Sequence, residues 1–326
     1  MTILPAALDI MGGDKAPAEI LAGAKAAVEE RNLNVTLVGP EEYRTVLPKA
    51  GFLSAAEVIA MDEDPTKSVR TKRDSSIVVA AEAVRDKEAS AMVSAGNTGA
   101  VMAAALLKMG RLPNVARPCI ATPLTIPGDL AKNPTIMVDA GANVECQPAW
   151  LVQFAKMAST YAKLRYGLSE PKVALLSNGE EDAKGNPLTK ETHQLLRQDS
   201  TVNFIGNLEG RDLLLGKADV IVTDGFTGNV ALKSLEGALS IFMNVLFKVI
   251  GTDEATKAAG NVLIPHLVPY AEALDPESTG GAMLLGVDGI CVISHGSSSA
   301  KAIVNALQLA QDMAVADLVG GLKAAI

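Results

Sequence analysis

Short apolar runs alternate with longer segments of helical periodicity along most of this chain. The runs cover residues 6–10, 34–38, 91–94, 135–139, 172–176, 220–223 and 289–294. The helical segments cover residues 17–31, 41–50, 99–109 and 147–166, and a last one begins at Ser299. Such alternation is typical of βαβ units. We therefore predict an α/β fold built around a mostly parallel sheet, in one large domain or two closely joined ones.

Glycine and small polar residues follow the predicted strands. Ligands of open parallel sheets bind outside the carboxyl ends of the strands, so we expect these loops to converge from one edge on one cleft. Glycine permits close approach, and a following helix offers unpaired N–H groups to an anion. The loops are Asp9-Ile-Met-Gly-Gly-Asp14, Ser94-Ala-Gly-Asn-Thr-Gly99, Asp139-Ala-Gly-Ala-Asn143, Ser177-Asn-Gly-Glu-Glu-Asp182, Thr223-Asp-Gly-Phe-Thr-Gly-Asn229 and Ser294-His-Gly-Ser-Ser-Ser299.

The strongest anion candidates are the loops at Gly96-Asn97-Thr98-Gly99 and Gly296-Ser297-Ser298-Ser299. Simple helix capping would also explain Asn97 and Ser297, and Asn229, after Gly228, fits a cap at the start of a helix. No phosphate-binding P-loop and no dinucleotide fingerprint is present, so we expect no cofactor.

Carboxylates in the loops could ligate a divalent metal, but each lies in a different loop and helix capping explains them equally. We therefore predict no metal; the residues are Asp9, Asp14, Asp139, Asp182, Asp224 and Asp288. No cysteine lies in a glycine-rich loop beside a histidine, and Ser177 is not in a nucleophile elbow. A covalent nucleophile is not expected.

The net charge limits the kinds of macromolecule that we expect the protein to bind. The net charge is −8, which argues against general nucleic-acid binding. The densest basic run is Lys67, Arg70, Lys72 and Arg73, which suits either an acidic protein partner or plain solvation. The N-terminus resembles no secretory signal, no cysteine pair suggests a disulfide, and no apolar run has the length of a membrane span. We predict a cytoplasmic protein.

The ordered set of loops resembles the bacterial phosphate acyltransferase (PlsX) family of glycerophospholipid synthesis, nearly from end to end. The resemblance implies transfer of an acyl group from acyl carrier protein to inorganic phosphate, giving an acyl phosphate for a downstream glycerol-3-phosphate acyltransferase. It also implies a homodimer. The implied fold is a single domain over residues 1–326, a three-layer αβα arrangement with a Rossmann-like sheet similar to that of the isocitrate and isopropylmalate dehydrogenases.

That chemistry requires donors that position phosphate and stabilise an oxyanion. The candidate catalytic residues are Lys184, Asn229 and His295, as donors to the thioester oxygen. The candidate substrate-binding residues are Asp9, Gly12, Gly13, Asp14, Ser94, Gly96, Asn97, Thr98, Asn143, Asn178, Asp224, Gly225, Ser297 and Ser298. Lys67, Arg70, Lys72 and Arg73 are the candidate docking residues for carrier protein.

A helical hairpin is expected near residues 230–275. Residues 239–247 are apolar over most of a helical circumference and residues 261–270 are again apolar. Such a helix buries its surface in a dimer, an acyl tunnel or a membrane interface. In the resembled family a hairpin of this region is associated with peripheral membrane contact.

Other functions fit some of the same features. A short-chain phosphate acyltransferase that uses acyl-coenzyme A needs similar anion loops. A dehydrogenase of similar architecture is less well matched, because nucleotide contacts have no counterpart. A non-catalytic scaffold for carrier protein and membrane would use the basic run and the apolar helix, but would not need so many polar loops.

Overall fold

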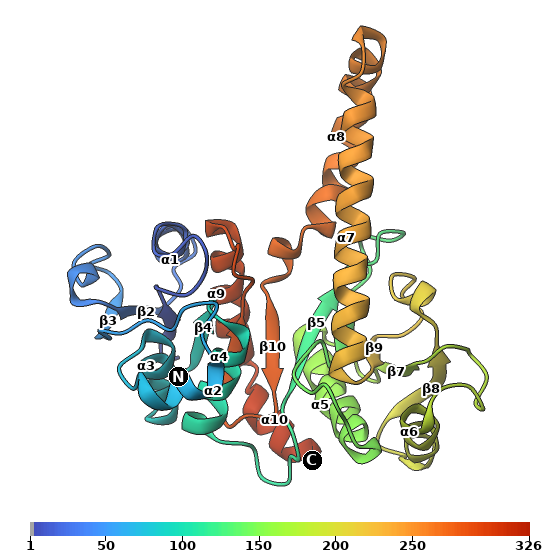
Figure 1. The fold of residues 1–326 in the computed structure, drawn as a ribbon, viewed down its shortest axis with the longest axis horizontal. Coiled ribbons are helices and arrows are strands. Elements are labelled where there is room, and N and C mark those ends of the chain that lie inside the picture. Colours follow the sequence, from blue (N-terminus) through green and yellow to red (C-terminus); the bar gives the residue numbers. More distant parts are fainter. Residues whose placement is uncertain (1–2) are drawn as a thin grey trace.

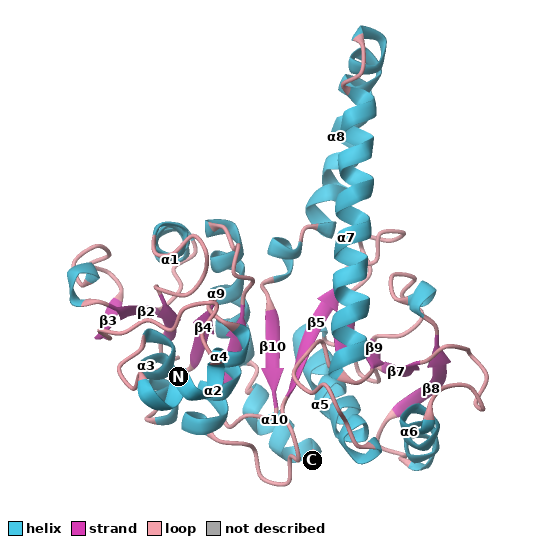
Figure 2. Cartoon of the chain, viewed as in Figure 1, coloured by secondary structure: helices cyan, strands magenta, loops and turns pink. Residues whose placement is uncertain are grey.

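The computed structural model describes residues 3–326, which build one eleven-stranded sheet flanked by helices (Figure 1, Figure 2). Its order is β3-β2-β1-β4-β11-β10-β5-β6-β9-β7-β8. The strands are β1 (Ala6–Asp9), β2 (Val35–Gly39), β3 (Gly51–Ser54), β4 (Ala91–Ser94), β5 (Cys119–Leu124), β6 (Thr135–Val138), β7 (Lys172–Leu176), β8 (Asn203–Leu208), β9 (Val220–Val222), β10 (Ala282–Leu285) and β11 (Ile290–Ile293).

The helices cover both faces of that sheet. The α-helices are α1 (Ala18–Glu30), α2 (Pro65–Thr71), α3 (Ser76–Arg85), α4 (Thr98–Ala104), α5 (Pro148–Tyr166), α6 (Pro187–Gln198), α7 (Gly225–Ile250), α8 (Glu254–Leu274), α9 (Ala300–Val315) and α10 (Leu318–Ala325). Short helical turns are η1 (Glu41–Tyr43), η2 (Ala105–Met109), η3 (Gly210–Asp212) and η4 (Pro276–Thr279). The predicted helix over residues 41–50 is wrong beyond η1, because Pro48 and Gly51 leave no room for further turns.

The sheet is mixed, because β5 and β10 reverse its direction. β10 pairs antiparallel with both β11 and β5, and β5 pairs antiparallel with β6. The strands β1, β2, β3, β4 and β11 therefore run opposite to β6, β7, β8 and β9. The expectation that all six loops leave one edge is wrong, since their strands end at opposite edges.

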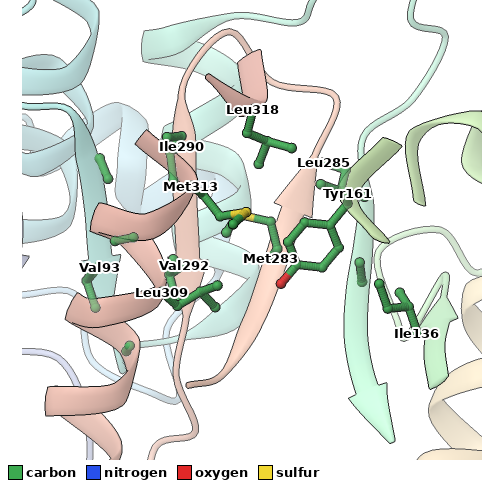
Figure 3. Packing of buried hydrophobic residues seen from close by; sticks show 14 of the residues in the cluster. Val93, Ile136, Tyr161, Met283, Leu285, Ile290, Val292, Leu309, Met313 and Leu318 are labelled. Atoms are coloured by element: carbon green, nitrogen blue, oxygen red, sulfur yellow. The ribbon is translucent and has the colours of Figure 1, made fainter. Parts of the chain in front are cut away.

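Two apolar clusters sandwich the sheet, one on each face. Alternate residues of β1 show the division: Leu8 belongs to the cluster under α1, α5, α9 and α10, and Ala7 to the cluster under α3 and α4. Figure 3 shows the first cluster where Met283 of β10 and Met313 of α9 meet Tyr161 of α5. This core fixes the strand ends, and with them the loops between the strands and helices.

The helices α7 and α8 leave the sheet as a long pair packed against each other (Figure 1). α7 is capped by Asp224, whose side chain accepts from Thr227 N, so Asn229 lies inside the helix and is not its cap. By length and composition α7 could cross a membrane, contrary to the expectation of no such span. Its first turns, however, line a cavity against the sheet.

Candidate functional site

A cavity of about 480 Å³ lies against the middle of the sheet, where residues of β5, β10 and β11 and the first turns of α7 line it. Loops from β4 and β11 reach it from one side, and the first turns of α7 reach it from the other. The two sets meet because α7 crosses the sheet from the opposite edge. We call this space the polar cavity because polar side chains gather in it, although Ile120, Leu232 and Ile293 also form part of its wall. Its polar lining includes Thr98, Thr122, Asn229, Lys233, Glu236, Asp275, Glu277, Ser294, His295, Ser297 and Ser298.

His295 is an exposed donor that the loop after β11 presents to the polar cavity. Its Nδ1 accepts a hydrogen bond from Ser297 N at 3.2 Å and lies 2.8 Å from Ser297 Oγ. A nitrogen that accepts from a backbone N–H carries no proton itself, so the neutral ring has its proton on Nε2. The local turn thus leaves His295 Nε2–H available to a ligand.

The backbone N–H groups of the same loop are already engaged. Ser298 N donates to His295 O, Ser299 N to Glu277 Oε1 and Ala300 N to Glu19 Oε2. Two carboxylates therefore occupy the start of α9, where an anion would otherwise bind. An anion in the polar cavity has to be held by side chains rather than by these N–H groups.

Ser294 is a cavity residue that the sequence prediction missed. It is 4% exposed, and within residues 3–326 its hydroxyl has no hydrogen-bond partner. A buried polar group without a partner is unusual and costs stability unless a ligand or water satisfies it. Its position at the carboxyl end of a predicted strand, directly before His295, was the available signal.

Asn229 and Lys233 share the face of α7 that lines the polar cavity. Asn229 Nδ2 donates to Ala140 O at 3.3 Å, which uses one of its two N–H groups. Lys233, four residues on, pairs with Glu236 Oε2 at 2.8 Å. Lys233 is the only lysine or arginine among the described residues lining this cavity, and its i+4 spacing from Asn229 was the missed signal.

The loop around Asn97 is divided between structure and site. Asn97 caps α4 by accepting from Ala100 N, and its Nδ2 donates to Met61 O at 2.9 Å. Thr98, the next residue, is exposed and lines the polar cavity. The capping explanation therefore accounts for Asn97, while Thr98 remains a ligand candidate.

The loop after β1 supports its neighbours. Asp9 is fully buried and accepts from Ser94 Oγ at 2.7 Å and from Met11 N at 3.0 Å. Burial raises the pKa of Asp9, although these hydrogen bonds oppose the shift. A Cβ at Gly12 would lie 2.7 Å from Gly96 N, Gly13 has a positive φ, and Asp14 N donates to Gly296 O.

The loop after β6 also turns inward. Asp139 Oδ1 accepts from the N–H groups of Ile120, Gly141 and Ala142, and Oδ2 accepts from both Asn143 N and Asn143 Nδ2. Burial is the largest influence on the pKa of Asp139 and raises it. Asn143 O accepts in turn from Gly225 N, so Asp139, Asn143 and Gly225 form one structural unit.

Other predicted residues gather at a second cavity, of about 380 Å³. Asn178 and Asp224 line it, together with Ser177, whose hydroxyl has no partner in the described part of the chain. Lys184 lines neither cavity; its stem packs over Gly179, beside Gly185 at the edge of the second one. The structure thus brings Asn229 and His295 together and leaves Lys184 apart.

The basic run lies on and after α2, which packs against α4 near Thr98. Lys67, Arg70 and Arg73 are exposed. Lys72 instead donates to Val58 O and pairs with Glu63, so it holds the loop together. Within residues 3–326, Lys67, Arg70 and Arg73 form no ion pair, and they lie on the side of the polar cavity where α2 packs against α4.

Two chemistries find no support among residues 3–326. No three histidine, cysteine, aspartate or glutamate side chains lie together as a metal site. Burial raises the pKa of Cys146 to about 11 and that of Cys291 to about 12. Thiols with such pKa values carry little thiolate near neutral pH and are poor nucleophiles.

The chain has a three-layer α/β fold with a mixed sheet, and solved phosphotransacylases share this fold. Its fold matches a branched-chain phosphotransacylase from Enterococcus faecalis V583, with a TM-score of 0.59 over 95% of this chain and 99% of that one, at 16% identity. A 4-hydroxythreonine-4-phosphate dehydrogenase from Klebsiella pneumoniae gives 0.55 over 95% and 99%, at 11% identity. At such identities the likeness shows the fold alone.

Sequence comparison places the chain in a family. Residues 4–319 match the model of the fatty acid synthesis protein family, and the chain belongs to that family. A phosphate acyltransferase from Nostoc sp. is 46% identical over 95% of this chain and 93% of its own length. One from Pelotomaculum thermopropionicum is 47% identical over 94% and 90%. The predicted family resemblance is confirmed.

Proposed function

We propose that the protein transfers an acyl group from acyl carrier protein to inorganic phosphate, giving an acyl phosphate in fatty acid and phospholipid synthesis. Membership of the fatty acid synthesis family and the phosphate acyltransferase relatives support an acyltransferase. The structural observation that carries the proposal is the polar cavity, where His295 Nε2, the unpartnered Ser294 hydroxyl and Lys233 line one space.

The reaction asks the protein to position two substrates that are already reactive. A phosphate oxygen attacks the thioester carbonyl carbon, the C–O bond forms, and the carbonyl oxygen becomes an oxyanion. The C–S bond then breaks, and the thiolate of the carrier arm leaves and takes up a proton. Neither a covalent intermediate on the protein nor a cofactor or metal is needed for this sequence.

His295 and Asn229 are the proposed oxyanion donors. His295 offers Nε2–H, because Nδ1 is occupied by Ser297 N. Asn229 keeps one N–H after its bond to Ala140 O. Preorganised donors of this kind stabilise developing charge strongly, since they need no reorganisation during the reaction.

Phosphate is proposed to bind beside them, at Ser294, Thr98, Ser297 and Lys233. Hydroxyl groups supply directional donors and Lys233 supplies positive charge. Ser298 contributes indirectly, because it is buried and its hydroxyl donates to His295 O at 2.6 Å. The glycines and Asp9 hold the loops that carry these side chains.

Lys184 remains a proposed catalytic residue. Because it lies beside the second cavity, its proposed role differs from that of His295. With Asn178 and Asp224 there, this region is available to the phosphopantetheine arm, whose thioester must reach the polar cavity. A Lys184→Ala protein that folds and keeps near-normal turnover would remove the lysine from the mechanism.

Carrier protein is proposed to dock on the face formed by Lys67, Arg70 and Arg73. Charge complementarity chiefly speeds encounter and sets orientation. Reversing Arg70 and Arg73 to glutamate should raise the apparent KM for acyl carrier protein and leave the turnover number at saturation nearly unchanged. An unchanged KM would exclude this docking face.

The outer face of the α7 and α8 pair supports the proposed homodimer or contact with a membrane surface. Ile241 is 67% exposed, Phe242 64% and Val262 68%. Apolar patches of this kind mark interaction sites. Sedimentation equilibrium and vesicle flotation separate the two partners. The proposed location is the cytoplasm, with peripheral membrane contact through this pair as the alternative to dimer packing. The proposed consumer of the product is a glycerol-3-phosphate acyltransferase.

Two structural expectations belong to the same proposal. The dehydrogenase among the structural neighbours supports a relation to the isocitrate and isopropylmalate dehydrogenase fold. The continuous sheet supports one catalytic domain over residues 1–326 with a helical hairpin near 230–275.

The deciding experiment incubates the purified protein with palmitoyl-acyl carrier protein, with and without phosphate, and traps acyl phosphate as its hydroxamate. Phosphate-dependent hydroxamate is the expected result. Product from acetyl-coenzyme A but not from the carrier thioester would favour the short-chain enzyme. A folded protein that binds carrier protein and forms no product from either would favour the scaffold.

A further inference from the structure

An apolar groove of about 350 Å³ continues from the polar cavity. The two spaces share lining residues, among them Thr122 of β5, Leu232 of α7 and Asp275 after α8. Beyond this junction the walls are mostly apolar, with Thr125 and Ser240 as polar exceptions. We call this space the apolar groove; its walls include Leu124, Leu214, Leu239, Met243, Ala271 and Leu274.

One face of α7 forms a long wall of the apolar groove. Leu232, Leu235, Leu239 and Met243 recur at helical spacing, are partly buried, and line the groove. With a rise of 1.5 Å per residue, this row extends about 16 Å from Leu232 to Met243. Val245, on another face of the helix, is 54% exposed and does not line the groove.

We propose that the apolar groove holds the acyl chain of the thioester, and that Leu239 and Met243 set the length it accepts. This inference rests on the proposed acyl transfer. The carbonyl lies at the junction by Thr122 and Leu232, within reach of the donors in the polar cavity, and the tail points toward Met243. A chain with one polar, reactive end and a long apolar remainder matches a polar cavity that opens into an apolar groove.

The observations favour this occupant over a second copy of the chain. A partner surface would cover the exposed outer face of α7, whereas the groove lies on the inner side, between α7, α8 and the end of β5. The groove is also continuous with the reactive site, which an acyl tail requires and a docked helix does not. Each methylene that enters should raise kcat/KM about fourfold, equivalent to ~0.8 kcal/mol.

The test fills the groove at two depths. Leu239 lies about 10 Å along α7 from Leu232, and Met243 about 16 Å. Leu239→Trp and Met243→Trp are assayed with carrier protein bearing acyl chains from octanoyl to palmitoyl. In both variants the ratio of palmitoyl to octanoyl transfer should fall more than tenfold below the wild-type ratio. The cut-off should fall at a shorter chain for Leu239→Trp.

Val245→Trp is the matched control, because it adds the same side chain to the same helix outside the groove. Its chain-length profile should follow the wild type. Ala271→Phe fills the groove from α8 and keeps the test valid if an α7 variant does not fold, as judged by circular dichroism. A wild-type profile in folded Leu239→Trp, Met243→Trp or Ala271→Phe would overturn the proposal.

The proposed function and the proposed acyl-binding groove can be refuted separately. If the wild type forms no acyl phosphate at any chain length, the proposed function falls, and the groove is tested by binding of pyrene-labelled hexadecanoic acid. Saturable binding that Met243→Trp weakens more than tenfold and Val245→Trp leaves unchanged would sustain an acyl site. Equal binding by all three proteins, or a change of oligomeric state without a change in binding, would rule it out.

Discussion

The loop after β6 folds its polar groups onto one buried carboxylate, whereas the loop after β11 folds its backbone around His295 and leaves side-chain atoms facing the polar cavity. Asp139 accepts five hydrogen bonds from its surroundings, and none of its oxygen atoms faces solvent. His295 is exposed, and among the residues that the structure describes it forms side-chain hydrogen bonds only through Nδ1. Similar strand-end sequences can therefore serve either packing or ligand binding, depending on where the polar atoms find partners.

The largest expected effect is on stability, from Asp139→Ala. Removing the carboxylate leaves buried N–H donors without acceptors, and each such donor costs about 1–3 kcal/mol. Since domains are stable by only about 5–15 kcal/mol, much of the margin is lost. Urea unfolding should shift to markedly lower concentration. A transition at the wild-type midpoint would show that Asp139 does not organise the loop.

His295→Ala should lower activity strongly and leave stability nearly unchanged, in contrast to Asp139→Ala. The exposed ring contributes little to folding, so the urea midpoint should stay close to that of the wild type. Loss of one preorganised oxyanion donor typically lowers kcat by about 10²–10³, measured as phosphate-dependent hydroxamate. His295→Gln, whose amide can donate, should recover part of the rate. Unimpaired turnover in His295→Ala would remove the contrast between the two loops.

Much of the fold follows from the sequence, but the strands β3, β5, β8 and β10 were not predicted. Of these, β5 and β10 are the two that reverse the sheet. Pro123 interrupts the apolar run of β5. Because β10 pairs only with Cys119–Ala121, this proline does not break the hydrogen bonds between β5 and β10. β10 is short and lies between the glycine pair at 280–281 and Gly286, a pattern that reads as a turn.

The sequence predicted several residues of the candidate site, but not which of them lie together. His295, Thr98, Ser297 and Asn229 line one cavity, yet Lys184 does not, because β7 and β11 end at opposite edges. Strand direction depends on long-range pairing, which local patterns do not encode. Ser294 was missed for a similar reason, since only the packed structure shows that its hydroxyl lacks a partner.

Ser294→Ala also tests whether a loop residue serves packing or ligand binding, with a smaller expected effect on activity than His295→Ala. Its hydroxyl has no partner within residues 3–326, so its removal should leave stability unchanged or slightly higher. A hydrogen bond to a charged ligand contributes about 1.5–3 kcal/mol, and the KM for phosphate should rise about tenfold. Calorimetric unfolding and phosphate titration measure the two effects. A fall in stability with an unchanged KM for phosphate would show that Ser294 stabilises the fold and does not bind phosphate.

The smallest expected effect is the pH dependence that Asp9 contributes. Burial raises the folded-state pKa of Asp9 above its ordinary value of 3.8, so the folded state binds this proton more tightly than the unfolded state. The associated stability is present in full below 3.8 and is lost as the pH rises through the folded-state pKa. Asp9→Asn cannot titrate. The free energy of unfolding of the wild type, measured against that of Asp9→Asn, should therefore decline as the pH rises from about 4 toward neutrality. A difference that grows over this range would mean that the hydrogen bonds from Ser94 and Met11 outweigh burial, and that Asp9 is held as a charged group like those of a ligand site.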